Sequence, residues 1–179
     1  IAAMPFEMDG WGVDVAVTGS QKGFMLPPGL AILAFGPRAL AATQAAGLSR
    51  AYFDLREMLG ATAGGGYPYT PPVGLIAGLG AAVARLEAEG MASVFARHRR
   101  LAQGVRCAVA AWGMRPCAVD PATLSDSVTA IVVPEGCDGA DLVRLAAQRY
   151  GVAFGAGLGA VAGRVFRIGH LGSLSDVLL

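Results

Sequence analysis

Short apolar runs dominate the first part of the chain. The run at 12–18, in which Asp14 is the one charged residue, predicts a buried strand, and the run at 30–35 predicts a second short strand. Pro37 then favours a short helix over 37–46, because proline suits the first turn of a helix. This part is therefore expected to run strand, turn, strand and helix.

Helical spacing takes over in the middle of the chain. After a glycine-rich loop over 60–70, apolar residues recur every three or four positions over 72–88 and again over 91–112. That spacing predicts two long helices. Gly90 lies between them and is expected to end the first, since glycine is a common helix stop.

The last part mixes strands with one helix. The apolar runs at 128–133 and 164–172 predict strands, and 138–150 predicts a helix with Asp138 as its N-cap. Strands that alternate with helices indicate an α/β protein.

The change of character within 90–112 sets the expected domain boundary. Residues 1–90 are expected to form part of a large α/β domain, and residues 91–179 a small α+β domain. The chain has no initiator methionine and stops within an apolar segment. We therefore expect a part of a longer protein, with a second domain that is incomplete at its end.

Composition and charge exclude several classes of protein. Hydrophobic residues make up 54% of the chain and the net charge is only +1, which argues against nucleic acid as a partner. No signal peptide or uninterrupted apolar stretch points to export or a membrane. Cys107, Cys117 and Cys137 lack the spacing of a metal site, so free thiols in a reducing, cytoplasmic compartment are expected.

Lys22 is the first candidate for chemistry. It is the only lysine in a chain with 14 lysines and arginines in total. A lysine amine can lose its proton when desolvated and attack a carbonyl, whereas a guanidinium stays protonated. The alternative is an ordinary loop lysine at the end of a strand.

Three further segments carry polar groups in unusual places. Arg167 stands between apolar residues, so it is expected to bind either a carboxylate ligand or a structural acidic partner. Tyr67 and Thr70 offer hydroxyls before a helix start, where phosphate binds well, although a threonine at such a place is more often an ordinary N-cap. His170 is expected to be structural, and His98 to be solvated on a helix face.

Together, these segments resemble the class V pyridoxal-phosphate aminotransferases. Within that family they are most similar to the branch that transfers an amino group from serine or alanine to glyoxylate. The matching segments are Trp11-Gly12-Val13-Asp14-Val15 with Thr18-Gly19-Ser20-Gln21-Lys22-Gly23, Tyr67-Pro68-Tyr69-Thr70-Pro71, and Phe166-Arg167-Ile168-Gly169-His170-Leu171-Gly172. The resemblance implies a fold-type-I transferase that uses pyridoxal 5'-phosphate. It also implies a homodimer with shared active sites.

The resemblance assigns a role to each candidate residue. Lys22 would bind the cofactor covalently and then act as base and acid in the proton transfer. Gln21 would help to hold the cofactor phosphate. Tyr67 and Thr70 would reach the phosphate of the neighbouring subunit's cofactor. Arg167 would clamp the α-carboxylate of the amino donor and of the 2-oxo acid acceptor.

The expected reaction is transfer of an amino group from a small amino acid, with serine as the leading donor, to glyoxylate. Alanine or aspartate as donor remains open, as does a non-catalytic scaffold that has kept the fold. A desulfurase or lyase of the same fold is a further alternative, but the three cysteines look poorly placed for it. Relatives carry other cofactor contacts upstream, so this stretch alone is expected to be inactive.

Overall fold

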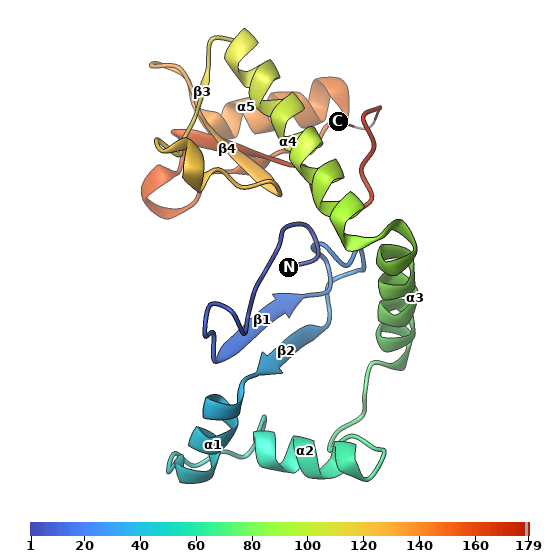
Figure 1. The fold of residues 1–179 in the computed structure, drawn as a ribbon. Coiled ribbons are helices and arrows are strands. Elements are labelled where there is room, and N and C mark those ends of the chain that lie inside the picture. Colours follow the sequence, from blue (N-terminus) through green and yellow to red (C-terminus); the bar gives the residue numbers. More distant parts are fainter. Residues whose placement is uncertain (178) are drawn as a thin grey trace. The chain divides into compact units, whose positions relative to one another are not determined.

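A computed structural model of the chain describes residues 1–177 and 179 (Figure 1). The chain divides into two compact units, one of residues 6–85 and one of residues 1–5 together with 86–179. In the part of the chain that the structure describes, no helix is both long and apolar enough to cross a membrane.

Residues 6–85 contain a two-stranded antiparallel sheet followed by helices. The elements are β1 (Val15–Gly19), β2 (Ala31–Phe35), α1 (Pro37–Ala45), α2 (Leu55–Ala63) and α3 (Val73–Glu89). The register pairs Val15 with Phe35 and Gly19 with Ala31. The two strands therefore run side by side along their whole length, and the connection between them is the segment that carries Lys22.

The prediction of a buried strand over 12–18 is wrong in both extent and burial. Gly12 has a φ of +66°, outside the extended region, and the strand begins only at Val15. Asp14 precedes the strand and accepts a hydrogen bond from Arg38 Nε at 2.7 Å. Only Ala16 is buried, and Val17 is 64% exposed. The charge at Asp14 thus belongs to a surface ion pair.

Helix α2 was not predicted from the sequence. Residues 60–63, which form its last turn, were expected to lie in a glycine-rich loop, yet the helix passes through Gly60. Asp54 caps it by accepting the Arg56 N–H at 2.9 Å. The Arg56 side chain also bonds Asp54, and these bonds hold the pKa of the Asp54 carboxyl well below its usual range. Capping by Asp54 therefore stabilises the start of this helix, although its sequence contains a glycine.

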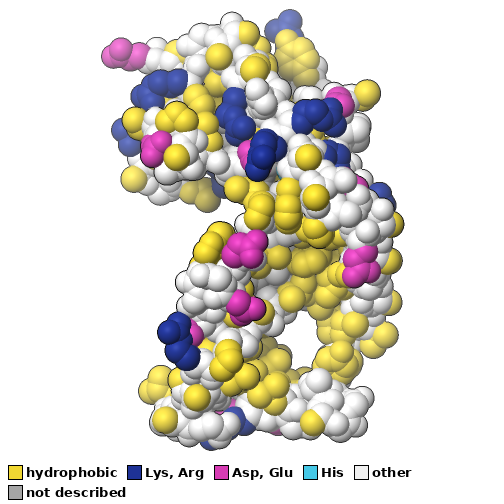
Figure 2. All heavy atoms as spheres, viewed as in Figure 1, with side chains coloured by type: hydrophobic (Ala, Val, Ile, Leu, Met, Phe, Trp, Pro, Cys, Tyr) yellow, Lys and Arg dark blue, Asp and Glu magenta, His cyan; other side chains and the backbone are white. Residues whose placement is uncertain are grey.

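The predicted helices over 37–46 and 72–88 are confirmed within a residue or two, and Pro37 is the first residue of α1. Apolar side chains are exposed along this part of the chain, and Figure 2 shows many of them over α2 and α3. Leu59 is 49% exposed and Val73 is 67% exposed. Ala16 and Ala82 are the only buried hydrophobic residues among residues 6–85, so this unit has little core of its own.

The second unit is an antiparallel sheet with two helices. Its elements are α4 (Met91–Ala111), β3 (Arg115–Pro116), a 3-10 turn (Pro121–Thr123), β4 (Val128–Val132), α5 (Gly139–Tyr150), β5 (Gly155–Ala156), a 3-10 turn (Gly159–Val161) and β6 (Val165–Gly169). The strand order is β3-β4-β6-β5. The predicted helices and the two long strands are confirmed, and Asp138 caps α5 by accepting the Ala140 N–H at 2.7 Å.

The core of this unit lies on one face of its sheet. Residues from both α4 and α5 pack there against strand residues of β4 and β6. The buried cluster consists of Val105, Val109, Ile131, Val133, Phe166 and Ile168, with Leu142 and Val143 packed against it. Side chains alternate between the two faces of a strand, so Arg167, between Phe166 and Ile168, points to the opposite face.

Both histidines are buried in this unit, and the expectation that His98 is solvated is wrong. His98 Nδ1 lies 2.7 Å from the Val94 carbonyl oxygen, and its Nε2 accepts the Gly172 N–H at 3.0 Å. His170 is bonded through Nδ1 to the Asp126 carbonyl and through Nε2 to the Thr129 hydroxyl. His98 thereby holds the segment that follows β6, and His170 ties the end of β6 to the start of β4.

Burial lowers the pKa of His170 below its ordinary value of 6.5, and nearby Arg106 lowers it further, while the bond to the Asp126 carbonyl opposes this. The unfolded chain therefore takes up a proton at this residue first as the pH falls. We expect the free energy of unfolding of the full-length protein to decrease as the pH falls below about 6.5. In His170→Gln this decrease should be smaller, as measured by urea unfolding between pH 7 and pH 5. Parallel losses in both proteins would contradict the prediction.

Candidate functional site

The connection between β1 and β2 is held by one buried side chain, Ser20. Its hydroxyl donates to the Pro27 carbonyl at 2.7 Å and accepts the Leu30 N–H at 3.2 Å. Its backbone N–H donates to the Leu30 carbonyl at 3.1 Å, and its carbonyl accepts the Leu26 N–H at 3.1 Å. Ser20 thus fixes the base of the connection, directly before Gln21 and Lys22.

Gln21 and Lys22 lie in this turn with exposed side chains. The Gln21 amide folds back over Gly19, where an added Cβ would lie 2.5 Å from Gln21 Oε1. Among residues 6–85, no hydrogen bond or ion pair engages the Lys22 amine. The Lys22 carbonyl accepts the Met25 N–H at 2.9 Å, which closes the turn and leaves the side chain free to meet a ligand.

Replacing Ser20 by alanine is expected to destabilise the protein by about 1–3 kcal/mol, because the Leu30 N–H and the Pro27 carbonyl lose their partner. The measurement is chemical unfolding of the full-length protein. Ser49→Ala is the matched control, since Ser49 is exposed in a loop of the same unit and should change stability by less than about 0.5 kcal/mol. Equal stability of the two variants would contradict the role given to Ser20.

Tyr67 and Thr70 lie in the connection between α2 and α3. Both are exposed, Tyr67 to 58%, and no hydrogen bond joins either hydroxyl to the rest of residues 6–85. Helix α3 begins only at Val73, so the alternative of Thr70 as its N-cap is wrong. In Figure 1 this connection lies beside the end of α2 and not beside the turn after β1. The structure therefore does not bring these hydroxyls to Lys22 of the same chain.

Arg167 lies in the middle of β6, between β4 and β5. Its partners in register are Ala130 on one side and Gly155 on the other. The side chain is half-buried, and its Nε donates to the Ala156 carbonyl at 3.0 Å. Within its own unit, no described carboxylate pairs with it. A structural ion pair, the alternative left open by the sequence, is thus not what the described residues of this unit provide.

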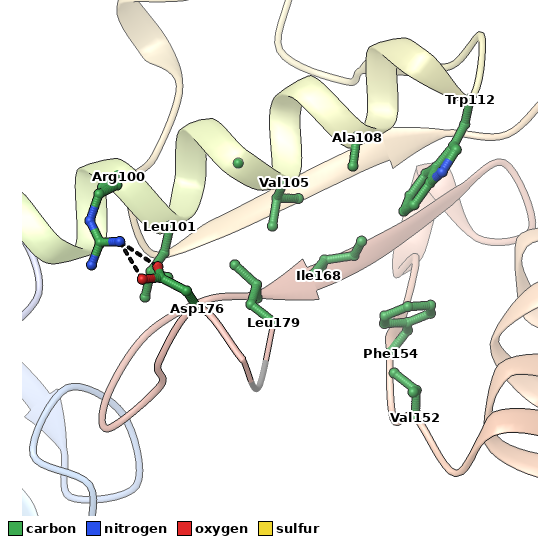
Figure 3. A pocket seen from close by; sticks show the side chains of 11 residues that line it. Arg100, Leu101, Val105, Ala108, Trp112, Val152, Phe154, Ile168, Asp176 and Leu179 are labelled. Carbon is green, nitrogen blue, oxygen red and sulfur yellow. Dashed lines mark hydrogen bonds and ion pairs between the residues drawn. The ribbon is translucent and has the colours of Figure 1, made fainter.

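A cavity of about 530 Å³ lies elsewhere in the same unit, between α4 and the segment after β6 (Figure 3). Apolar side chains line most of it, including Val105, Phe154 and Ile168, and Arg100 pairs with Asp176 at one side. Ile168 points into it from β6, so Arg167, its neighbour, points to the other face of the sheet. The candidate site residues Gln21, Lys22, Tyr67, Thr70 and Arg167 are not among the residues that line this cavity.

The chain is similar to known proteins over nearly its whole length. It is 61% identical to an L-aspartate–glyoxylate aminotransferase of Paracoccus denitrificans, over 99% of this chain and 45% of that protein. It is 48% identical to a serine–glyoxylate aminotransferase of Hyphomicrobium methylovorum, over 100% of this chain and 45% of that protein. The chain thus spans about half the length of the curated relatives it matches.

Solved structures show the same fold. An alanine–glyoxylate aminotransferase of Nostoc superposes with a TM-score of 0.88 at 28% identity, over 96% of this chain and 46% of that one. A pyridoxamine–pyruvate aminotransferase of Mesorhizobium loti gives 0.84 at 31% identity, over 96% and 44%. The fold is therefore that of the fold-type-I transferases. The model of the family described as "Aminotransferase class-V" matches residues 1–170, and the chain belongs to that family.

Proposed function

We propose that the complete protein transfers an amino group from a small amino acid to glyoxylate, with serine as the leading donor. The observation that carries this proposal is the identity of 46–61% to serine– and aspartate–glyoxylate aminotransferases along the whole chain. The exposed lysine turn and the arginine of β6, which pairs with no described carboxylate of its unit, supply the two groups that such a reaction needs from this part of the protein.

Aminotransferases of this family use pyridoxal 5'-phosphate, and the residues of the lysine turn fit it. The fit rests on an amine without a protein partner in its unit, at the end of a strand, with an amide side chain beside it. When bound, this cofactor supplies an electron sink that makes the hydrogen on the amino acid's α-carbon acidic. We propose that Lys22 holds the cofactor covalently and that Gln21 donates to its phosphate.

Proton transfer is the second task proposed for Lys22. With the cofactor bound and an incoming amino acid in its place, the free amine of Lys22 would take the proton from the amino acid's α-carbon as a base and give it back as an acid. Correct placement of such a base contributes about 10²–10⁴-fold to a rate. Ser20 supports this by fixing the chain just before the turn, so that the amine returns to the same position in each cycle.

Arg167 is proposed to bind the carboxylate that the amino donor and the 2-oxo acid have in common. Its Nε is already engaged by the Ala156 carbonyl, so one edge of the guanidinium is fixed. The remaining N–H groups can form parallel hydrogen bonds to a carboxylate. One anchor for both substrates suits a reaction in which the second substrate occupies the site that the first has left.

The remaining residues favour an active site shared between subunits. Tyr67 and Thr70 carry exposed hydroxyls that are not directed at Lys22 of their own chain, and we propose that they bind the cofactor phosphate in a partner subunit. The protein would then be a homodimer, which we place in the cytoplasm.

We further propose that residues 1–90 belong to the large cofactor-binding domain and residues 91–179 to the small domain. The rest of the protein would cover their exposed apolar surfaces.

Aspartate is the second candidate donor, since the relative at 61% identity is an L-aspartate–glyoxylate aminotransferase. The test is an assay of the purified full-length protein with glyoxylate and serine, aspartate or alanine, with glycine formation as the readout. Glycine formation that depends on both the amino acid and pyridoxal phosphate is expected. If no donor yields glycine, the protein is instead the non-catalytic scaffold.

A further inference from the structure

The guanidinium of Arg167 lies over a residue that has no side chain. Gly155 is its register partner across the β5–β6 pair. A Cβ added at Gly155 would lie 3.2 Å from Arg167 Nε, 3.3 Å from Nη2 and 3.4 Å from Cζ. A real Cβ at such distances would force the guanidinium to move by a few tenths of an ångström. The absence of a side chain at Gly155 thus makes room for the planar group.

Backbone conformation does not explain the glycine at this position. Several glycines of the unit, such as Gly151 and Gly163, have positive φ values that other residues avoid, but Gly155 is not one of them. Its conformation is that of an ordinary strand residue. The contact with Arg167 is therefore the specific reason for a glycine here.

Two neighbouring residues, together with Gly155, surround the guanidinium of Arg167. The Ala156 carbonyl accepts from Arg167 Nε at 3.0 Å and so fixes the rotation of the guanidinium plane. On the other side, the register partner is Ala130 of β4, whose side chain is a single methyl group. The small residues on both sides and the carbonyl together define one direction for the free N–H groups.

We infer that Gly155 is a positioning residue, which sets the direction of the Arg167 guanidinium and thereby the affinity for the substrate carboxylate. This inference rests on the proposed function of Arg167. A larger side chain at position 155 should therefore raise KM for the amino acid and for the 2-oxo acid alike. The proton transfer at Lys22 should be unaffected.

The test uses the full-length enzyme with glyoxylate and its amino donor. Gly155→Ala is expected to raise both KM values by about 3–10-fold with little change in kcat, since displacements near 1 Å cost up to about 100-fold. Gly155→Val, whose side chain is larger and displaces the guanidinium further, should raise both KM values more. The control is Gly104→Ala, because Gly104 lies in α4 of the same unit and an added Cβ would meet nothing within 4 Å.

A double-mutant cycle separates this inference from the role of Arg167 itself. In an Arg167→Lys background, which lacks the planar group, Gly155→Ala should change KM by less than about 2-fold. An undiminished effect in that background, or unchanged KM values in Gly155→Ala while Arg167→Lys raises them, would overturn the inference alone. If neither substitution changes KM, the carboxylate role of Arg167 fails and the inference fails with it.

Folding of the variants gives an independent readout. If Gly155→Ala does not fold by itself, the double variant with Arg167→Lys should recover folding, because the flexible lysine can yield where the guanidinium cannot. A double variant that also stays unfolded would overturn the inference. A crystal structure of Gly155→Ala should show the Arg167 Nε to Ala156 oxygen distance lengthened from 3.0 Å, and an unchanged distance would overturn it as well.

Discussion

Lys22→Ala in the full-length protein is expected to lower the rate of amino-group transfer by at least about 10³-fold, because covalent cofactor binding and proton transfer are both lost. The residue is the only lysine of this chain, and its side chain has no partner within its own unit. The measurement is single-turnover formation of glycine from glyoxylate.

Lys22→Arg is the matched variant for this prediction. It keeps the positive charge but not an amine that can lose its proton, so it should be as inactive as Lys22→Ala. With the cofactor removed from all three proteins, both variants should unfold at the same temperature as the wild type, since the side chain is exposed. Activity retained in Lys22→Arg would mean that the charge alone matters, and function retained in both would favour the scaffold alternative.

Arg167→Ala is expected to raise KM for the amino donor and for glyoxylate by about 10²-fold or more, because a hydrogen-bonded charge pair with the substrate is lost. Arg167→Lys keeps the charge without the planar pair of donors and should raise both values by about 10-fold. The change should lie mainly in KM, because the contact is made with the ground state and the transition state alike.

Arg164→Lys provides the control for this prediction. Arg164 is an exposed arginine three residues earlier, and its Nη2 donates to the Ala160 carbonyl at 2.6 Å. Its substitution should leave both KM values unchanged. A change in KM for only one of the two substrates in Arg167→Ala would contradict a common carboxylate anchor.

The larger elements of the fold could be predicted from local patterns. Helical spacing located α3 and α4 because each of these helices buries a stripe of apolar residues, and Asp138 marked the start of α5. The same reasoning missed α2, since Gly60 suggested a loop and the capping by Asp54 was overlooked. The two-residue strands β3 and β5 have too few residues to show any period, so only the pairing with their neighbours reveals them.

In the candidate site, only the residues whose type alone suggests a chemical role could be predicted from the sequence. Lys22 and Arg167 were distinctive because a single lysine and an arginine within an apolar run are chemically unusual. Ser20 and Gly155 were not, since a serine and a glycine occur in most loops, and their roles arise from contacts made across a turn or a strand pair. His98 was misjudged because the arginines around it suggested a solvated face, although its own position faces the core.

The most direct test of the central claim is borohydride reduction of the full-length protein as purified, followed by peptide mass mapping. The account predicts a pyridoxyl adduct on Lys22, which would identify the cofactor and the catalytic lysine together. No adduct on Lys22, even after pyridoxal phosphate has been added back, would contradict an aminotransferase that uses this residue.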